Sequence, residues 1–158
     1  MKINTLNTLT ILILLSSFSF SKKHYPQREY QYNVTIYRDL WGVPHVYGEK
    51  DIDAAFGLAY AHAEDDFKTI QDVLLVIRGK SGSIYGKNGA PIDYLVGLLK
   101  VWKTVEQNYE QGLSAEIKQV CNAYADGINR YIEKHQIKVK KDLYPIRGID
   151  IIAGFVFR

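Results

Sequence analysis

Residues 51–77 constrain the fold of this chain more than any other stretch of the sequence. Asp51 and Asp53 suit the positive N-terminal end of a helix, and the Ala-rich segment 54–63 favours helical structure. Apolar residues then recur at three- and four-residue steps, the period of one helical face: Phe67, Ile70, Val73, Leu74 and Ile77. The pattern stops at Gly79, a residue typical of helix ends. The stretch predicts one long amphipathic helix whose apolar face other elements must cover.

Two short β-rich runs precede this helix. Residues 33–37 alternate, residues 39–42 have the composition of a turn, and residues 43–47 form a second run with Pro44 near its start. Proline is tolerated at the beginning of a strand, where its missing N–H disrupts little. The two runs therefore predict a β-hairpin.

The segments after Gly79 are mainly helical in pattern. The Gly/Ser/Asn-rich stretch 79–89 predicts a connection, and Pro91 begins a helical pattern that extends to Trp102. Ser114 is placed to cap a further helix, whose apolar stripe recurs at helical steps: Leu113, Ile117, Val120, Cys121, Tyr124, Ile128, Tyr131 and Ile132.

A basic, polar segment over 134–141 leads to an apolar run over 150–157, close to Arg158. Two interpretations of this run stay open: a short C-terminal helix that docks on the core, or the front of something larger. The patterns together predict an α+β fold that is mainly helical with an N-terminal β-hairpin.

The composition excludes several classes of protein. A chain of 158 residues that is 47% hydrophobic and 13% aromatic is long and apolar enough to bury a core, and it is not disordered. A net charge of +3 without a stripe of Lys and Arg argues against nucleic-acid binding. Cys121 is the single cysteine, so no intrachain disulfide forms. Its place on an apolar stripe predicts buried packing rather than a nucleophile.

Residues 1–21 have the pattern of a secretory signal peptide. Lys2 precedes an apolar run over 9–20, which is too short to span a membrane comfortably, and Ser19-Phe20-Ser21 is a small-x-small cleavage candidate. We therefore expect an exported chain, periplasmic or secreted, without stable membrane insertion after cleavage. An uncleaved N-terminal anchor is the alternative. Residues 22–33 are expected to form an exposed segment before a domain over 34–158.

Three acidic and basic side chains offer a candidate metal site. His62, Asp65 and Asp66 share one helical face at i, i+3 and i+4. Only one imidazole is present, so a structural cluster paired with Arg38 or Arg78 is favoured over a metal site.

A second pair of carboxylates, Asp93 and Asp126, has nothing in the sequence that brings it together. The sequence therefore assigns no catalytic, cofactor-binding or metal-binding residue.

Four segments, in order along the chain, resemble the α-chain start of the penicillin acylase family: VTIYRDLWGVPHV at 34–46, AAFGLAYAHAED at 54–65, Arg78-Gly79, and YADGIN at 124–129. The His-Ala-Glu-Asp form at 62–65 and the segment Asp93-Tyr94-Leu95 are most similar to the acyl-homoserine-lactone and aculeacin acylase branch. The resemblance covers about residues 34–133.

This resemblance implies an exported N-terminal-nucleophile amidohydrolase, made as one precursor that cuts itself into α- and β-chains with an αββα fold. The implied nucleophile is a Ser, Thr or Cys at the start of the β-chain, with its own α-amino group as base. The oxyanion hole would also lie on the β-chain. This sequence has no Gly-Ser-Asn or Gly-Cys-Asn junction. The implied calcium ligand and acyl-pocket residues would follow the end of this chain, so the resemblance implies that calcium ligands are not present here.

Three functional hypotheses follow. The chain is an incomplete acylase α-chain that, with a β-chain, hydrolyses the acyl-amide bond of an N-acyl-homoserine lactone or of a β-lactam or lipopeptide side chain. Such activities belong to quorum quenching or antibiotic metabolism. Alternatively, it is a non-catalytic periplasmic binding or interaction domain, or a degenerate gene product without a stable fold.

Overall fold

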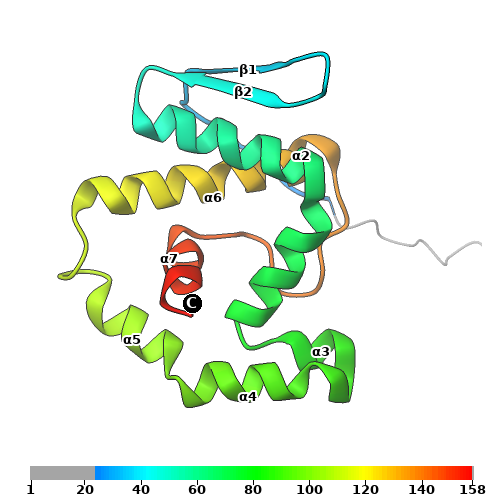
Figure 1. Ribbon diagram of the computed structural model, residues 1–158, viewed down its shortest axis with the longest axis vertical. Helices are drawn as coiled ribbons and strands as arrows, with labels where there is room; N and C mark the ends of the chain where they lie inside the picture. The colour runs from blue at the N-terminus through cyan, green and yellow to red at the C-terminus, as the bar shows by residue number, and fades with distance from the viewer. Residues whose placement is uncertain (1–23, 158) are drawn as a thin grey trace, which may run out of the picture.

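The protein is mainly helical, with a two-stranded antiparallel sheet at its N-terminal end, as predicted (Figure 1). The computed structural model describes residues 24–157, so the expected signal peptide over 1–21 lies outside the described residues. The elements in chain order are β1 (Val34–Arg38), β2 (Pro44–Gly48), α2 (Asp51–Ile77), α3 (Ser81–Tyr85), the 3-10 turn η1 (Gly86–Asn88), α4 (Ala90–Leu98), α5 (Val101–Asn108), α6 (Ala115–His135) and α7 (Gly148–Val156). Over the described part of the chain, none of these helices has the length and apolar character to cross a membrane.

The β-hairpin lies along the first half of α2. Strands β1 and β2 pair with Ile36 opposite Val46, which confirms the predicted hairpin. Within the turn, the Asp39 carboxylate accepts two backbone N–H hydrogen bonds of 2.9 Å each. The inward side chains of the strands meet α2 at Gly57, where a Cβ would overlap Val34 and Val46. A glycine at this position therefore lets the sheet approach the helix.

Helices α2 and α6 run side by side beneath the hairpin (Figure 1). Helix α6 begins after Ser114, whose Oγ accepts a hydrogen bond from the Ile117 N–H (3.3 Å), which confirms the predicted cap. Gly127 sits where the two helices touch. A Cβ there would overlap the Phe56 carbonyl oxygen and lie 2.8 Å from the Ala59 Cβ. Close packing thus compensates for the low helix propensity of glycine.

Helix α2 is bent, which the sequence pattern did not indicate. Asp66 has non-helical backbone angles (φ −150°, ψ 68°). Its carboxylate accepts hydrogen bonds from the Thr69 N–H (3.0 Å) and hydroxyl (2.5 Å), so it caps the second half of the helix as an N-cap residue would. The bend directs the second half toward α3 and α4 (Figure 1).

The predictions for residues 79–102 are wrong in two respects. The expected connection contains α3, whose first N–H groups at Ser81 and Gly82 donate to the Asp93 carboxylate (2.8 and 2.7 Å). The expected single helix from Pro91 to Trp102 is two helices, because Lys100 adopts a left-handed conformation (φ 52°) between α4 and α5. The break turns α5 back toward α7 and the end of α2, where the Trp102 indole N–H donates to the Ile77 carbonyl (2.8 Å).

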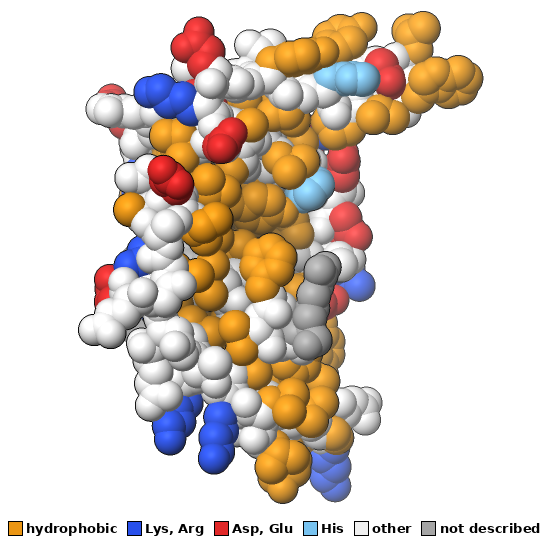
Figure 2. Space-filling view, turned by 60° about the vertical axis from the view of Figure 1, so that its left-hand side comes forward, with side chains coloured by type: hydrophobic (Ala, Val, Ile, Leu, Met, Phe, Trp, Pro, Cys, Tyr) orange, Lys and Arg blue, Asp and Glu red, His pale blue; other side chains and the backbone are white. Residues whose placement is uncertain are grey.

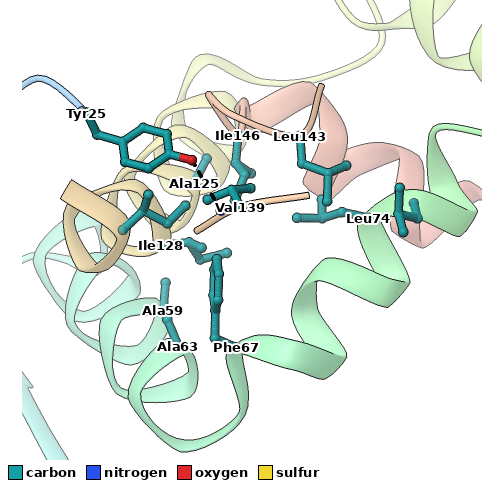
Figure 3. Close-up of a cluster of buried hydrophobic side chains, with 12 residues drawn as sticks. Tyr25, Ala59, Ala63, Phe67, Leu74, Ala125, Ile128, Val139, Leu143 and Ile146 are labelled. Atoms are coloured by element: carbon teal, nitrogen blue, oxygen red, sulfur yellow. Dashed lines mark hydrogen bonds between the residues drawn. The ribbon is translucent and has the colours of Figure 1, made fainter. Parts of the chain in front are cut away.

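The main core joins α2, α6 and the loop that precedes α7 (Figure 3). Its buried members are Tyr25, Ala59, Ala63, Phe67, Leu74, Leu75, Ala125, Ile128, Ile132, Val139, Leu143 and Ile146. A second cluster packs α5 and α7 against the end of α2 through Ile77, Val96, Val101, Val105 and Ala153. The apolar run over 150–157 is therefore part of a helix docked on the core.

A buried ion pair fixes α7 and its preceding loop to the end of α2. The Arg78 guanidinium donates to both carboxylate oxygens of Asp150 (3.0 and 2.6 Å). It also donates to the backbone carbonyls of Asp142, Leu143 and Pro145 at 2.7 to 3.1 Å. Burial opposes ionisation of Asp150, but the hydrogen bonds and charge of Arg78 outweigh it and hold the pKa of this carboxyl below its usual value.

Residues 24–33, which we call the N-terminal strap, are anchored rather than free. Tyr25 is buried in the core, whereas most other residues over 24–33 are exposed. The buried Glu133 carboxylate accepts hydrogen bonds from Arg28 Nε (2.7 Å), the Tyr30 hydroxyl (3.0 Å) and the Tyr144 hydroxyl (2.7 Å). Burial of Glu133 favours its neutral form, yet these donors lower its pKa overall. The guanidinium of Arg28 in the strap thus pairs with the buried carboxylate of Glu133 on α6.

We expect Gly127→Ala to destabilise the fold by about 1–3 kcal/mol, because α6 must move away from the α2 backbone. Gly97→Ala is the matched control, since a Cβ at Gly97 meets nothing within 4 Å. The control should be neutral or stabilise the protein by up to about 1 kcal/mol. Urea unfolding followed by circular dichroism measures both, and equal effects would contradict the packing assigned to Gly127.

Arg78→Met should cost about 3–5 kcal/mol of unfolding free energy, because it leaves Asp150 buried without its main partner. Arg147 contacts the same carboxylate at 3.4 Å, but its side chain is 59% exposed. Arg147→Met should therefore cost at most about 1 kcal/mol. The same unfolding measurement compares the two variants, and a loss of similar size in both would argue against a special role for Arg78.

Candidate functional site

The three residues that offered a candidate metal site do not act together. His62 Nδ1 lies 2.7 Å from the Tyr124 hydroxyl, and Asp65 pairs with Arg38 at 2.8 Å. Asp66 caps the second half of α2 instead, because the helix bends there. The favoured hypothesis of a structural cluster is confirmed for Arg38 and Asp65. It is wrong in proposing Arg78 as an alternative partner, since that residue pairs with Asp150.

The carboxylates Asp93 and Asp126 also have separate structural roles. Asp93 caps α3, whereas Asp126 accepts a hydrogen bond from the Tyr32 hydroxyl of the strap (2.9 Å). Burial raises the pKa of Asp126 above its ordinary value, and the Tyr32 hydrogen bond opposes this only in part. Between residues 24 and 157, no group of three or more His, Cys, Asp or Glu side chains is placed to hold a metal ion.

An open apolar groove runs between α2, α6 and α7, and we call it the α2/α6/α7 groove. It has a volume of about 500 Å³. Aliphatic and aromatic side chains form most of its lining, which comprises Thr69, Ile70, Val73, Leu74, Ile77, Val120, Cys121, Tyr124, Ile128, Asp150, Ile151, Gly154 and Phe155. Its one carboxylate, Asp150, is neutralised by Arg78. The groove therefore favours an apolar occupant over a charged one.

Cys121 lies on the wall of this groove, on the apolar stripe of α6. The residue is 6% exposed, which confirms the predicted buried position. Burial raises the pKa of its thiol above the ordinary value, so the thiolate that a nucleophile requires is disfavoured. The residue serves packing.

The hairpin presents a second apolar surface, which we call the hairpin outer face. At the tip, Leu40 is 101% exposed and Trp41 is 89% exposed. Tyr37 and Tyr47 project from the strands on the side that does not meet α2, and both are exposed. Figure 2 shows hydrophobic side chains from the hairpin at the top down one face of the molecule. Exposed apolar surface of this kind is typical of sites that bind another polypeptide.

Sequence reasoning placed the hairpin but missed both surfaces. Alternation within each strand places Tyr37 opposite in direction to Ile36, and Tyr47 to Val46, and the pairing of the strands makes this one common face. Trp41 stands in the turn, where little can bury it. The sequence gives a weaker indication of the groove than of the hairpin outer face. Val73 belongs to the predicted core stripe of residues 51–77, and only the structure shows that its side chain is 51% exposed.

Comparisons with known proteins assign the chain to a family. Its sequence matches the penicillin amidase family over residues 33–148. An acyl-homoserine lactone acylase QuiP of Pseudomonas fluorescens (strain Pf-5) is 29% identical over 111 residues, covering 70% of this chain and 14% of the relative. Penicillin acylase 2 proenzyme of Pseudomonas sp. (strain SE83) is 30% identical over 99 residues, covering 63% of this chain and 13% of the relative. The chain thus spans about one seventh of the length of these relatives, from their N-terminal part.

The fold is similar to that of a thermostable penicillin G acylase from Alcaligenes faecalis. The TM-score is 0.63 with 21% sequence identity, and the likeness covers 78% of this chain and 70% of the other. The family match includes the hairpin, α2 and α6, the elements that build the core and present the hairpin outer face. On the sequence match over most of its length, this chain belongs to the penicillin amidase family.

Proposed function

We propose that this chain is the N-terminal, α-chain part of an amidohydrolase that cleaves an acyl-amide bond once a second chain supplies the nucleophile. The family match over residues 33–148 carries this proposal, because it covers scaffold elements and only about one seventh of the length of relatives named as acylases. Those names support an N-acyl-homoserine lactone or the side chain of a penicillin-type β-lactam as the substrate, and the resemblance to aculeacin acylases adds a lipopeptide side chain. Quorum quenching or antibiotic metabolism is the corresponding role.

The surroundings of Cys121 and His62 are consistent with a nucleophile and a base that lie on a second chain. Amide hydrolysis requires a nucleophile, a base and donors for the oxyanion. In the described part of this chain, Cys121 is buried with a raised pKa, and the His62 imidazole is hydrogen-bonded to Tyr124. We assign the nucleophile to a Ser, Thr or Cys that begins a β-chain, where its α-amino group, with a pKa of about 8, serves as the base.

Calcium has no role that can be derived from this chain. The family resemblance suggests a calcium ion, but the residues over 24–157 offer no cluster of three or more acidic, His or Cys ligands for one. A hard cation such as calcium takes 6–8 oxygen ligands. A calcium site in the complete enzyme would therefore need ligands from outside these residues, and no step here passes through a metal.

Export to the periplasm or the medium is part of the proposal. The pattern of residues 1–21 supports it, with cleavage after Ser21. The folded part would then begin close to the strap, whose Tyr25 is packed in the core. No nucleic acid enters the proposed reaction.

A non-catalytic interaction domain is the second candidate. The exposed Leu40 and Trp41 side chains favour it, because a surface that binds a polypeptide is useful with or without catalysis. A degenerate product that does not fold receives no such support, since the buried charges Glu133 and Asp150 are both paired.

The isolated chain should release no fatty acid from an N-acyl-homoserine lactone and no acyl group from a penicillin-type amide. Product release is measured by liquid chromatography, with the chain alone, with the polypeptide that follows the matched region in the QuiP acylase of P. fluorescens, and with both. Only the mixture should be active. Turnover by the chain alone that is lost in Cys121→Ala would refute the assignment of the nucleophile to a second chain. A complex without turnover would favour the interaction domain.

A further inference from the structure

We propose that the α2/α6/α7 groove is the docking site for an apolar helix of the chain that completes the enzyme. This inference rests on the proposed function and specifies where on this chain the second chain binds. The hairpin outer face is also exposed, but the groove is a hollow with walls from three helices. An amphipathic helix binds such a groove through apolar anchors on one face.

The strongest argument is that core positions of two helices are left uncovered along this groove. On α2, Phe67, Leu74 and Ile77 of the apolar stripe are buried, yet Val73 of the same stripe is 51% exposed. On α6, Ile128 of the stripe is buried, while Val120 of the same stripe, which also lines the groove, is only partly buried. The periodicity indicates a buried face, and no described element of this chain completes the burial of Val73 and Val120. A further element is needed to bury them.

The polar groups in the groove are already satisfied. Asp150 accepts hydrogen bonds from the Arg78 guanidinium and from the Arg147 backbone N–H (2.8 Å). The Tyr124 hydroxyl lies 2.7 Å from His62 Nδ1. A charged or strongly polar ligand would lose its hydration in the groove and gain no free partner there. An apolar helix face loses little hydration free energy and buries the exposed aliphatic side chains.

The relatives indicate where such a helix comes from. They are about seven times as long as the region matched by this chain, so most of an acylase lies outside the matched part. Helix α7, which forms one wall of the groove, begins at Gly148, the last residue of the family match. Polypeptide that follows this region in a relative would therefore start beside the groove. We commit to this occupant rather than to a second copy of the same chain.

The rate at which Cys121 is alkylated reports whether the groove is occupied. It is the only cysteine of the chain and it lines the groove. The full chain is mixed with the polypeptide that follows the matched region in the QuiP acylase, and alkylation by N-ethylmaleimide is followed by mass spectrometry of the peptide that contains Cys121. In the complex, alkylation should be about tenfold slower or more than in the free chain, because the docked helix must leave before the reagent enters.

A pair of matched variants tests the same site by affinity. Val73→Asp places a charge in the groove at a half-exposed position, so the free chain should still fold, as circular dichroism can verify. Leu98→Asp adds the same charge at a 61% exposed position on α4, outside the groove. Val73→Asp should weaken the complex about tenfold or more, and Leu98→Asp should leave it within about twofold of the original value.

The remaining outcomes distinguish the proposed docking site from the proposed function. A stable complex in which Cys121 is alkylated as fast as in the free chain would overturn the docking site and leave the proposed function standing. The absence of any complex with the unsubstituted chain would overturn both. Protection of Cys121 in the free chain that increases with its concentration would identify a second copy as the occupant and overturn the assignment to an acylase helix. Protection in the unsubstituted complex decides the question even if Val73→Asp fails to fold.

Discussion

The second half of the structure depends on one buried guanidinium. Arg78 stands directly after α2, yet it holds Asp150 of α7 and three carbonyls of the loop before it. A carboxylate that is fully buried is tolerated only because this donor and the backbone N–H of Arg147 satisfy it. The position of α7 follows from this pair. Because α7 is one wall of the α2/α6/α7 groove, the shape of the groove follows from it as well.

The other buried carboxylate organises the opposite end of the chain in the same way. Glu133 on α6 collects donors from the N-terminal strap and from Tyr144, so residues more than a hundred positions apart are joined. Asp66, Asp93 and Asp126 likewise have partners within the fold, and Arg38 is paired with Asp65. The polar chemistry of these residues stabilises the scaffold, whereas the α2/α6/α7 groove and the hairpin outer face are mainly apolar. This distribution is consistent with the proposed function, in which the chain positions a catalytic partner.

Local patterns were sufficient for the hairpin, the extent of α2 and the start of α6. Strand alternation, a helical period and a Ser cap are all set by neighbours within a few residues. The bend at Asp66 was missed because Asp is compatible with a helix until its side chain caps the following turn. The break at Lys100 was missed because it depends on where α5 finds apolar partners, namely beside α7. The strap was missed since its partner Glu133 is remote in sequence.

The site was harder to predict than the fold for a physical reason. Periodicity shows which face of a helix is apolar, but it does not show which part of that face the same chain will cover. Leu74 and Val73 are adjacent members of one stripe, and only one of them is buried by the chain itself. The resemblance to the penicillin acylase family supplied what periodicity lacked, namely that an α-chain is expected to have a partner. Under the proposed docking, an uncovered residue on a core stripe marks where that partner binds, and such a residue is recognised only when the fold shows which stripe residues remain exposed.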